Sequence, residues 1–350
     1  MDGVPAAKRQ RTTNPVSPPA TFTSAAVVAA PATPAESVAA DVPAGDGTAT
    51  AQRLSQQSPI ASRQAEKSAM CQASPPLPSF SLLTYNIWCE PVMFEERMRE
   101  VGRIIVSSGC PDLILFQEVT PHSHALFASQ AWWGRYRCQP SEGEVRAFPE
   151  EAVFTMTLCK RATVHSVEFE MPSVFEDSPE GRKFADRDLK VVRGEVGGER
   201  LLAANVHLEQ GASGIKDMYD TLAQLNGQRE CANVFLAGDT NWLPSLDPKH
   251  RLGLPPGWQD AWLELHGPGT PTPDQGHTYD GVHNRMCRSK AQARFDRILY
   301  TSPVWRVRRI RRVGMTQIQG LCFRETERSR PRPLYPSDHF GLLADFGPPG

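Results

Sequence analysis

The sequence has no continuous apolar run of the roughly 18–20 residues that a membrane-spanning helix requires. It also has no C-x-x-C pair, because its eight cysteines are scattered and lack the spacing of a disulfide framework or a zinc site. No apolar segment typical of a signal peptide follows the first residues, Met-Asp-Gly. From these absences we expect no membrane partner, and cysteines that are reduced thiols in the cytosol or nucleus.

The first 78 residues lack aromatic side chains almost entirely. Phe22 is their one aromatic residue, whereas they contain eleven prolines and are otherwise rich in Ala, Ser, Thr and Gln. Such a segment cannot bury enough apolar surface to offset the entropy cost of ordering it. All seven tryptophans and 14 of the 15 phenylalanines follow Ser79. We therefore predict a disordered N-terminal region, 1–78, and one large folded domain, 79–350.

The overall charge of −1 conceals an uneven distribution. Residues 285–332 contain fourteen Lys and Arg against three acidic residues. This favours a polyanionic partner, although a solvated charged surface would have the same composition. A short basic cluster in the N-terminal region, Lys8-Arg9-Gln10-Arg11, resembles a nuclear import signal. We therefore expect the protein in the nucleus, with the cytoplasm as a second compartment.

Apolar runs typical of buried strands recur along the folded domain. Apolar side chains at helical spacing predict a helix over 94–108, and a second helix is expected over 216–230. The expected strands are 80–87, 112–117, 152–159, 162–170, 201–208, 233–237, 294–300, 304–313 and 340–346. Because strands outnumber helices and helices recur between them, we predict an α/β fold with two packed β-sheets and helices outside.

Polar side chains recur where the predicted strands end. They are Asn86, Glu118, His207, Asp239, Asn241, Asp296, Asp338 and His339. Each has an ordinary explanation, since Asp and Asn are common in turns and a single His is usually a structural residue. Strand ends are also where a rigid scaffold presents functional groups with small positional error. Their recurrence therefore favours one shared site.

The chemistry of this set points to a phosphoester. Carboxylates and amide oxygens without a Cys or His cluster suit a hard divalent cation, Mg²⁺ or Mn²⁺, rather than zinc. Histidines beside carboxylates suit a site that stabilises charge on phosphoryl oxygens. Together these groups indicate metal-assisted hydrolysis of a phosphodiester.

Six motifs, in their order and spacing, resemble those of the endonuclease/exonuclease/phosphatase superfamily. They are TYNIW (84–88), DLILFQEV (112–119), NVHLE (205–209), FLAGDTNW (235–242), RFDRILY (294–300) and YPSDHFGLL (335–343). Within the superfamily, HLE, AGDTN, RFDRI and PSDHFGL together resemble the phosphodiesterases that remove tyrosine from 5′ DNA ends left by trapped topoisomerase II. The resemblance implies a DNase I-like, four-layer α/β sandwich, with two central, mostly antiparallel β-sheets flanked by helices.

The resemblance also implies roles for the residues at the strand ends. Glu118 corresponds to the principal Mg²⁺ ligand, and Asp338 to an outer-sphere or second metal contact. Asn86 corresponds to the amide that orients the phosphate or a metal-bound water. Asp239 corresponds to the residue that positions and deprotonates the attacking water, and Asn241 can reach the same phosphate.

The two histidines of the set receive roles in the same way. His339 corresponds to the imidazolium that stabilises charge in the transition state, and Asp296 to the partner that raises its pKa. His207 corresponds to a further phosphate contact. The leaving group would be a phenolate, which needs little help from a general acid.

The residues expected to grip the substrate are partly altered. Trp88, Val153 and Leu243 stand where related proteins often carry an Asp, an aromatic residue and an Arg. Lys216 is the only substitute for an Arg expected after the HLE motif, and Tyr279 stands where a Trp is usual. These departures leave the contacts with the DNA end open, whereas the residues expected to carry the chemistry are all present.

Two retained residues, Arg294 and Phe295, could steer and stack on a terminal nucleotide. With Tyr279 and Lys216 they complete the expected substrate-binding set. We therefore predict a monomeric, Mg²⁺-dependent phosphodiesterase of DNA repair, acting on DNA ends that carry 5′-phosphotyrosine or topoisomerase II peptide adducts. The alternatives are a related phosphodiesterase acting on RNA ends, protein–RNA links, abasic sites or a lipid headgroup, and a non-catalytic nucleic-acid-binding scaffold.

Overall fold

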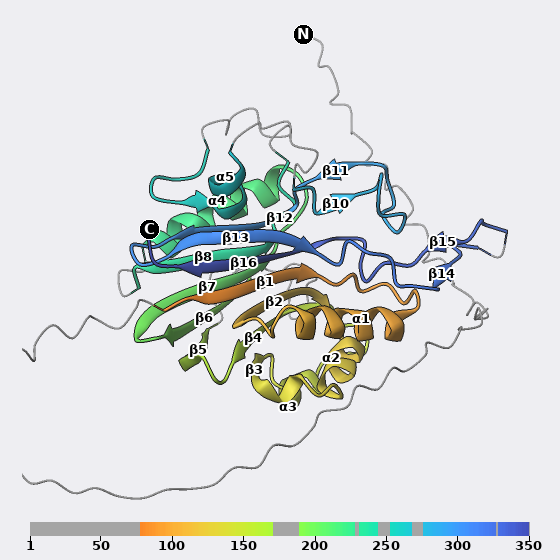
Figure 1. Cartoon of the computed structure of the whole chain (residues 1–350), viewed down its shortest axis with the longest axis horizontal. Coiled ribbons are helices and arrows are strands. Elements are labelled where there is room, and N and C mark those ends of the chain that lie inside the picture. The colour runs from red at the N-terminus through yellow and green to blue at the C-terminus, as the bar shows by residue number, and fades with distance from the viewer. Residues whose placement is uncertain are drawn as a thin grey trace, which may run out of the picture.

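Two six-stranded β-sheets form the centre of the structure, a computed structural model (Figure 1). It describes residues 78–170, 189–227, 231–243, 253–267, 276–326 and 328–349. The predicted disorder of the N-terminal region and its import signal fall on 1–77, outside the described residues.

The first sheet contains the N-terminal and C-terminal strands of the folded part. Its strands follow the order β13 (Arg306–Val313), β16 (Gly341–Gly347), β1 (Phe80–Asn86), β2 (Leu113–Val119), β4 (Phe154–Lys160) and β3 (Tyr136–Gln139). The pair β1 and β2 is parallel, and the other neighbours are antiparallel.

The second sheet is built from the middle of the chain. Its strands follow the order β5 (Val164–Glu170), β6 (Leu189–Val196), β7 (Glu199–His207), β8 (Asn233–Asp239), β12 (Asp296–Thr301) and β9 (Gln259–Asp260). The pair β7 and β8 is parallel, and the other neighbours are antiparallel. Both sheets are thus mostly antiparallel, as the family resemblance implied.

The two sheets pack face to face, and helices cover their outer faces. Phe80 and Leu115 of the first sheet share a core with Phe235 and Ile298 of the second. Helices α1 (Phe94–Ser107) and α2 (Pro121–Ala128) pack on the outer face of the first sheet, and α4 (Ala212–Asn226) packs on that of the second (Figure 1). The four-layer α/β sandwich predicted from the sequence is therefore confirmed.

Burial on both faces explains the continuous apolar runs of the central strands. All seven residues of β8 are buried, and six of the seven residues of β1 are buried. A strand between two layers needs apolar side chains on both sides, so the alternation typical of a half-exposed strand is lost.

The first predicted helix, 94–108, agrees with α1, whereas the second begins earlier than predicted, at Ala212. The predicted end of that second helix, 228–230, lies outside the described residues.

Shorter elements connect and flank the sheets. They are η2 (Trp133–Arg135), α3 (Glu142–Val145), α5 (Ala261–His266), the hairpin of β10 (Tyr279–Asp280) and β11 (Gln292–Ala293), and the hairpin of β14 (Cys322–Phe323) and β15 (Arg332–Pro333). Within the described part of the chain, no helix has the length and apolar character that crossing a membrane would require.

Candidate active site

Strand pairing brings the polar strand ends of both sheets to one edge. In the second sheet, Asp239 stands opposite His207 on one side and opposite Asp296 on the other. In the first sheet, Thr84 of β1 pairs with Leu342 of β16, so that Asn86 and His339 lie just beyond this pair. The register of these five strands thus gathers residues that are far apart in the sequence.

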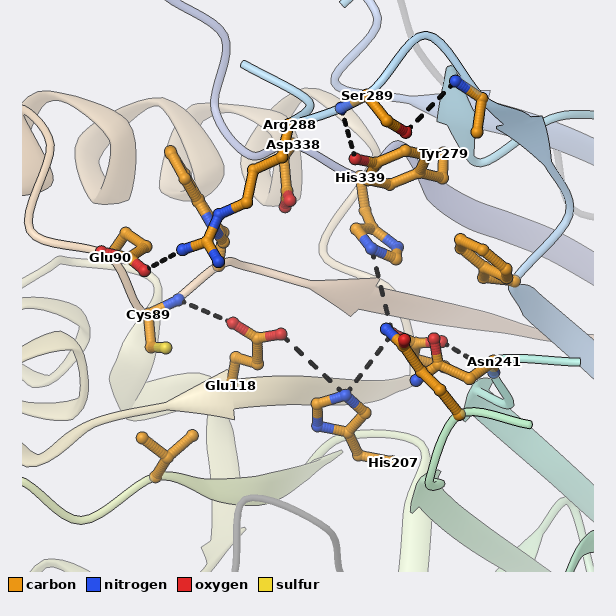
Figure 2. Close-up of a pocket in the computed structure, with 16 residues that line it drawn as sticks. Cys89, Glu90, Glu118, His207, Asn241, Tyr279, Arg288, Ser289, Asp338 and His339 are labelled. Atoms are coloured by element: carbon orange, nitrogen blue, oxygen red, sulfur yellow. Dashed lines mark hydrogen bonds and ion pairs between the residues drawn. The ribbon is translucent and has the colours of Figure 1, made fainter. Parts of the chain in front are cut away.

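A cavity of about 440 Å³ opens at this edge, and we call it the first cavity (Figure 2). Six of the predicted site residues line it together with Tyr279 and Phe295: Glu118, His207, Asp239, Asn241, Asp338 and His339. Asn86 and Asp296 are fully buried directly behind these residues and hydrogen-bond to them. The structure therefore brings together all eight polar residues singled out at the strand ends.

Glu118 is held by two hydrogen bonds at an irregular point of β2. Its φ is 58°, and the pairing with β4 shifts register between Phe116 and Val119. Asn86 Nδ2 donates to Oε1 at 3.0 Å, and the backbone N–H of Cys89 donates to Oε2 at 3.0 Å. A left-handed φ at a non-glycine residue carries a strain cost, which is common at functional sites. The result is a carboxylate turned into the cavity with its orientation fixed.

The pKa of Glu118 lies well below that of an ordinary Glu. Burial would raise it, but the nearby His207 and the hydrogen bonds from Asn86 and Cys89 lower the pKa of Glu118 to about 2. Its carboxylate is therefore ionised over the whole physiological range.

Asp239 lies at the centre of the polar cluster. Its Oδ1 accepts the backbone N–H of Asn241 at 2.9 Å, and its Oδ2 accepts Asn86 Nδ2 at 3.1 Å. The same Oδ2 lies 3.5 Å from His207 Nε2 and 3.9 Å from His339 Nε2. Asp239 therefore faces two imidazoles across the cavity.

The turn after β8 is set by Asn241, which adopts a left-handed φ of 47°. Asn tolerates this region better than most residues, because its short polar side chain can bond locally. Asn241 Nδ2 donates to Leu208 O at 2.9 Å. This hydrogen bond ties the turn to the end of β7, while Asn241 still lines the first cavity.

His339 forms a buried pair with Asp296. Its Nδ1 lies 2.7 Å from Asp296 Oδ2, and neither residue is more than 6% exposed. Burial would lower the pKa of His339, but the charges of Asp296 and Asp239 hold it well above its ordinary value. The imidazolium form is thus favoured, with Nδ1 directed to Asp296 and Nε2 directed toward Asp239.

Asp338 is a buried carboxylate whose charge is poorly compensated. Burial raises its pKa to about 7, and the negative charge of Glu118 adds to this effect against the opposing charge of His339. Glu118 and Asp338 repel each other at the cavity wall, and a bound cation would reduce this repulsion.

The described residues contain one group of nitrogen and carboxylate donors close enough to hold a metal ion. The donor atoms of Asp239, Asp296 and His339 all lie within 4.8 Å of one another. Within this group, His339 Nδ1 and Asp296 Oδ2 lie 2.7 Å apart and form a hydrogen bond with each other. The oxygen-rich side of the cavity, at Glu118 and Asp338, therefore suits a hard divalent cation better.

The four predicted substrate-binding residues divide into two pairs. Tyr279 and Phe295 line the first cavity, with their ring centroids 5.5 Å apart and those of Tyr279 and His339 5.4 Å apart. Arg294 instead forms two hydrogen bonds with Asp260, at 3.1 and 2.6 Å. Its guanidinium is therefore paired with the buried carboxylate of Asp260, and Arg294 does not line the first cavity.

Lys216 also lies away from the first cavity. It is exposed on α4 and pairs with Asp220 one helical turn away. Of the three altered positions, Trp88 and Val153 line the cavity, whereas Leu243 does not. The structure does not test the binding roles themselves, which stay predictions.

Arg288 and Glu90 are cavity residues that the sequence motifs did not reveal. Both line the first cavity and form an ion pair with each other (Figure 2). Arg288 lies in the connection between β10 and β11, and Glu90 lies in the loop after β1. Loop residues carry no periodicity, and the basic composition of 285–332 was the only signal that pointed to this segment.

A family model, the Endonuclease/Exonuclease/phosphatase family, matches residues 83–339. The 5′-tyrosyl-DNA phosphodiesterase of Caenorhabditis elegans is 28% identical over 168 residues, 46% of this chain and 41% of that protein. Tyrosyl-DNA phosphodiesterase 2 of Xenopus laevis is 26% identical over 280 residues, 76% of this chain and 66% of that protein. The chain thus spans about two fifths to two thirds of the length of these relatives.

Solved structures show the same fold. The structure of D. rerio TDP2 with a single-strand DNA product has a TM-score of 0.61 at 21% identity, over 77% of this chain and 99% of that chain. The human Nocturnin catalytic domain has a TM-score of 0.52 at 18% identity, over 78% of this chain and 94% of that chain.

Proposed function

The chain belongs to the endonuclease/exonuclease/phosphatase family, and we propose that it is a phosphodiesterase that separates tyrosine from the 5′ phosphate of a DNA end. One observation carries the proposal. Asp239, the His339–Asp296 pair and Glu118 converge on a single cavity large enough for a phosphodiester. Two relatives named as tyrosyl-DNA phosphodiesterases support this choice of substrate.

Asp239 is the residue best placed to activate water. Its Oδ1 is held by the backbone of Asn241, and its Oδ2 faces the cavity beside two imidazoles. As the oxygen of water bonds to phosphorus, the Asp239 carboxylate accepts the proton of that water. The bond from phosphorus to the tyrosyl oxygen breaks, and the phenolate leaves with its electron pair.

His339 stabilises the negative charge that builds up on the phosphoryl oxygens. With Nδ1 held by Asp296 at 2.7 Å, its Nε2–H can donate to a phosphoryl oxygen in the cavity. His207 lies on the opposite side of Asp239 and can contact the same phosphate. Because both imidazoles are positioned before the substrate arrives, little reorganisation is needed during the reaction.

Glu118 and Asp338 would hold Mg²⁺ or Mn²⁺, which when bound supplies positive charge opposite the phosphoryl oxygens. Both donor groups are carboxylates, as these hard cations prefer, and no cysteine or histidine nitrogen is needed. Topoisomerase II peptide adducts are the natural source that we propose for such ends. The basic cluster at 8–11 supports a nuclear location for the reaction.

The proposal is tested with a single-stranded oligonucleotide that carries a 5′-phosphotyrosine, incubated with Mg²⁺ or with EDTA. We expect tyrosine release in Mg²⁺ and none in EDTA. Glu118→Ala should lower kcat/KM at least about 10²-fold, because the cation loses its ionised ligand. The matched control is Glu195→Ala, which removes a carboxylate near the turn between β6 and β7, at the other end of the sheet.

Two results would contradict the proposal. One is release of tyrosine in EDTA at the rate seen in Mg²⁺, and the other is full activity of Glu118→Ala. Turnover of an abasic-site or RNA substrate without tyrosine release would place the protein elsewhere in the same family.

A further inference from the structure

A second cavity adjoins the first and shares two wall residues with it. It has a volume of about 460 Å³, and Arg288 and Ser289 line both cavities. The other residues that line it are Gly281, Arg285, Cys287, Lys290, Pro331, Arg332 and Pro333. Its walls are therefore the connection between β10 and β11 and the strand β15.

These two walls are tied to each other by specific contacts. Arg332 Nη1 donates to Arg285 O at 3.4 Å, and Tyr335 Oη donates to His283 O at 3.2 Å. Beneath them, Met286 packs in an apolar cluster with Trp88, Ile318, Phe323 and Leu334. The second cavity is consequently part of the packed structure and continues from the rim of the first cavity.

The lining of the second cavity is strongly basic. Arg285, Arg288, Lys290 and Arg332 contribute four cations, and among the described residues no carboxylate lines this cavity. Arg288 pairs with Glu90 and Arg332 with Glu325, but both of these carboxylates are partly exposed and lie outside the lining. Among the described residues no ion pair is formed by Arg285 or Lys290. The second cavity therefore favours an anion.

The described residues of this lining also include no aromatic side chain, whereas Tyr279 and Phe295 line the first cavity. Bases of single strands bind by stacking on aromatic rings, and backbone phosphates bind to Arg and Lys. A cavity with four cations and no ring is suited to a phosphate and not to a base.

We propose that the second cavity binds a backbone phosphate of the same single strand whose 5′ end reacts in the first cavity. The proposal rests on the proposed function, because it requires a nucleic acid in the first cavity. Arg288 and Ser289 line both cavities, so a strand bound in the first cavity passes next to the second. Recognition at this point depends on the charge of the backbone and is independent of the base sequence.

The test compares a long and a short substrate. The long one is a single-stranded oligonucleotide with a 5′-phosphotyrosine. The short one is the 5′-(p-nitrophenyl) phosphodiester of thymidine, which carries only the reacting phosphate. The double variant Arg285→Ala/Arg332→Ala should raise KM for the oligonucleotide about fivefold to tenfold and leave its kcat unchanged. For the short ester, both constants should match those of the wild type.

Salt dependence gives a second readout. The slope of log KM against log salt for the oligonucleotide should become shallower by about 0.7 for each phosphate contact removed. The matched control is Arg308→Ala/Arg309→Ala, which removes two exposed arginines of the same basic region on β13. Arg309 pairs with Asp345, well along β16 from the strand end at the site, so this control should behave like the wild type.

An oligonucleotide KM that is equal in the double variant and in the control would overturn the proposal. A rise in KM for both substrates would also overturn it, because the arginines would then act on the reacting phosphate. If the double variant is unstable to heat, Lys290→Ala replaces it, since Lys290 is exposed. If the wild type cleaves neither substrate, the proposed function fails. The fluorescence anisotropy of a labelled oligonucleotide is then measured in EDTA with the wild type and with the double variant. Weaker binding by the double variant would show that the second cavity binds the oligonucleotide.

Discussion

The floor and the rim of the first cavity are built under different physical constraints. The floor consists of Asn86, Glu118, Asp239, Asp296 and His339, which lie at strand ends and contact one another through hydrogen bonds or close ion pairs. The rim consists of Glu90, Tyr279, Arg288 and Ser289, which lie in the loop after β1 and around the β10–β11 hairpin (Figure 2). The floor is held by two sheets, and the rim by loops.

This difference separates two tasks. Stabilising charge in a transition state requires groups fixed before the substrate arrives, because a small displacement removes much of the benefit. Gripping a charged polymer requires exposed cations, and each contact is screened by water and salt. The side chain of Arg288 is 76% exposed, and that of Asp239 is 3% exposed. Changes in the floor should therefore affect kcat, and changes in the rim should affect KM.

The largest effect is expected for Asp239→Asn. The substitution keeps the shape of the side chain but removes the charge that accepts the proton of water and faces His207 and His339. We expect kcat to fall by about 10³-fold or more, since general-base catalysis contributes roughly 10²–10⁴-fold. Steady-state kinetics on the p-nitrophenyl ester measure this change. Asp220→Asn, an exposed carboxylate of α4, is the control.

If Asp239→Asn changed KM and left kcat intact, Asp239 would belong with the rim. The distinction between the two regions would then be lost at its central residue.

Gly238→Ala tests whether the backbone of the floor can make room for one additional methyl group. Gly238 has a φ of 147°, and a Cβ at this position would lie 1.9 Å from Val206 O on the neighbouring parallel strand. We expect a loss of about 3 kcal/mol in the free energy of unfolding, because β7 and β8 must separate or distort. Urea denaturation measures it.

The control for this substitution is Gly198→Ala. Gly198 has a positive φ of 87°, but among the described residues no atom lies within 4 Å of its Cβ position. It should cost only about 1 kcal/mol, the strain of a left-handed alanine. Equal costs at the two glycines would show that the close approach at Gly238 is not what fixes the strand ends.

The residues of the floor could be predicted from the sequence because the strands that hold them have recognisable patterns. Continuous apolar runs mark strands buried on both faces, and a polar residue at the end of each is visible without any structure. The family motifs added the roles. The register that places Asp239 opposite both His207 and Asp296 could not be predicted, because pairing depends on contacts between distant segments.

Of the rim, only Tyr279 was predicted; Glu90, Arg288 and Ser289 were not, because they lie in loops without periodicity. Arg294 illustrates the difficulty. Its position in the RFDRI motif indicated a substrate contact, but the carboxylate of Asp260 engages it at 2.6 Å. Asp260 is 34 residues away in the sequence, and nothing local reveals that it binds Arg294 and Arg297 together. Arg288, by contrast, belongs to no motif and still reaches the first cavity.

Asp296→Asn should change the pH dependence of the floor. Despite burial, Asp296 and Asp239 hold the pKa of His339 well above its ordinary value, so the imidazolium persists to alkaline pH. Without the charge of Asp296 that pKa falls, and the imidazolium is lost at a lower pH. The alkaline limb of the profile of kcat should therefore move to lower pH, with a loss of about 10²-fold on that limb.

Tyrosine release from the oligonucleotide, measured across the pH range, checks this. A variant whose kcat falls by the same factor at every pH would show that Asp296 only orients the ring of His339. Glu195→Gln is the control, because Glu195 lies near the turn between β6 and β7, at the other end of the sheet.

The smallest effects are expected at the rim, where two substitutions should act in opposite directions. Arg288→Ala removes a cation from the wall shared by both cavities and should raise KM about fivefold, the value of one exposed charge contact. Glu90→Gln removes the partner that holds Arg288 in the free protein. It should lower KM by about twofold, because Arg288 no longer has to break its ion pair with Glu90 before it binds a phosphate of the substrate.

Neither rim substitution should change kcat by more than about twofold, and the p-nitrophenyl ester and the oligonucleotide should both respond. This response distinguishes Arg288 from Arg285 and Arg332, which should affect the oligonucleotide alone. A KM that rises in Glu90→Gln as it does in Arg288→Ala would mean that the ion pair itself shapes the cavity. In that case the rim, like the floor, is held in place before the substrate arrives.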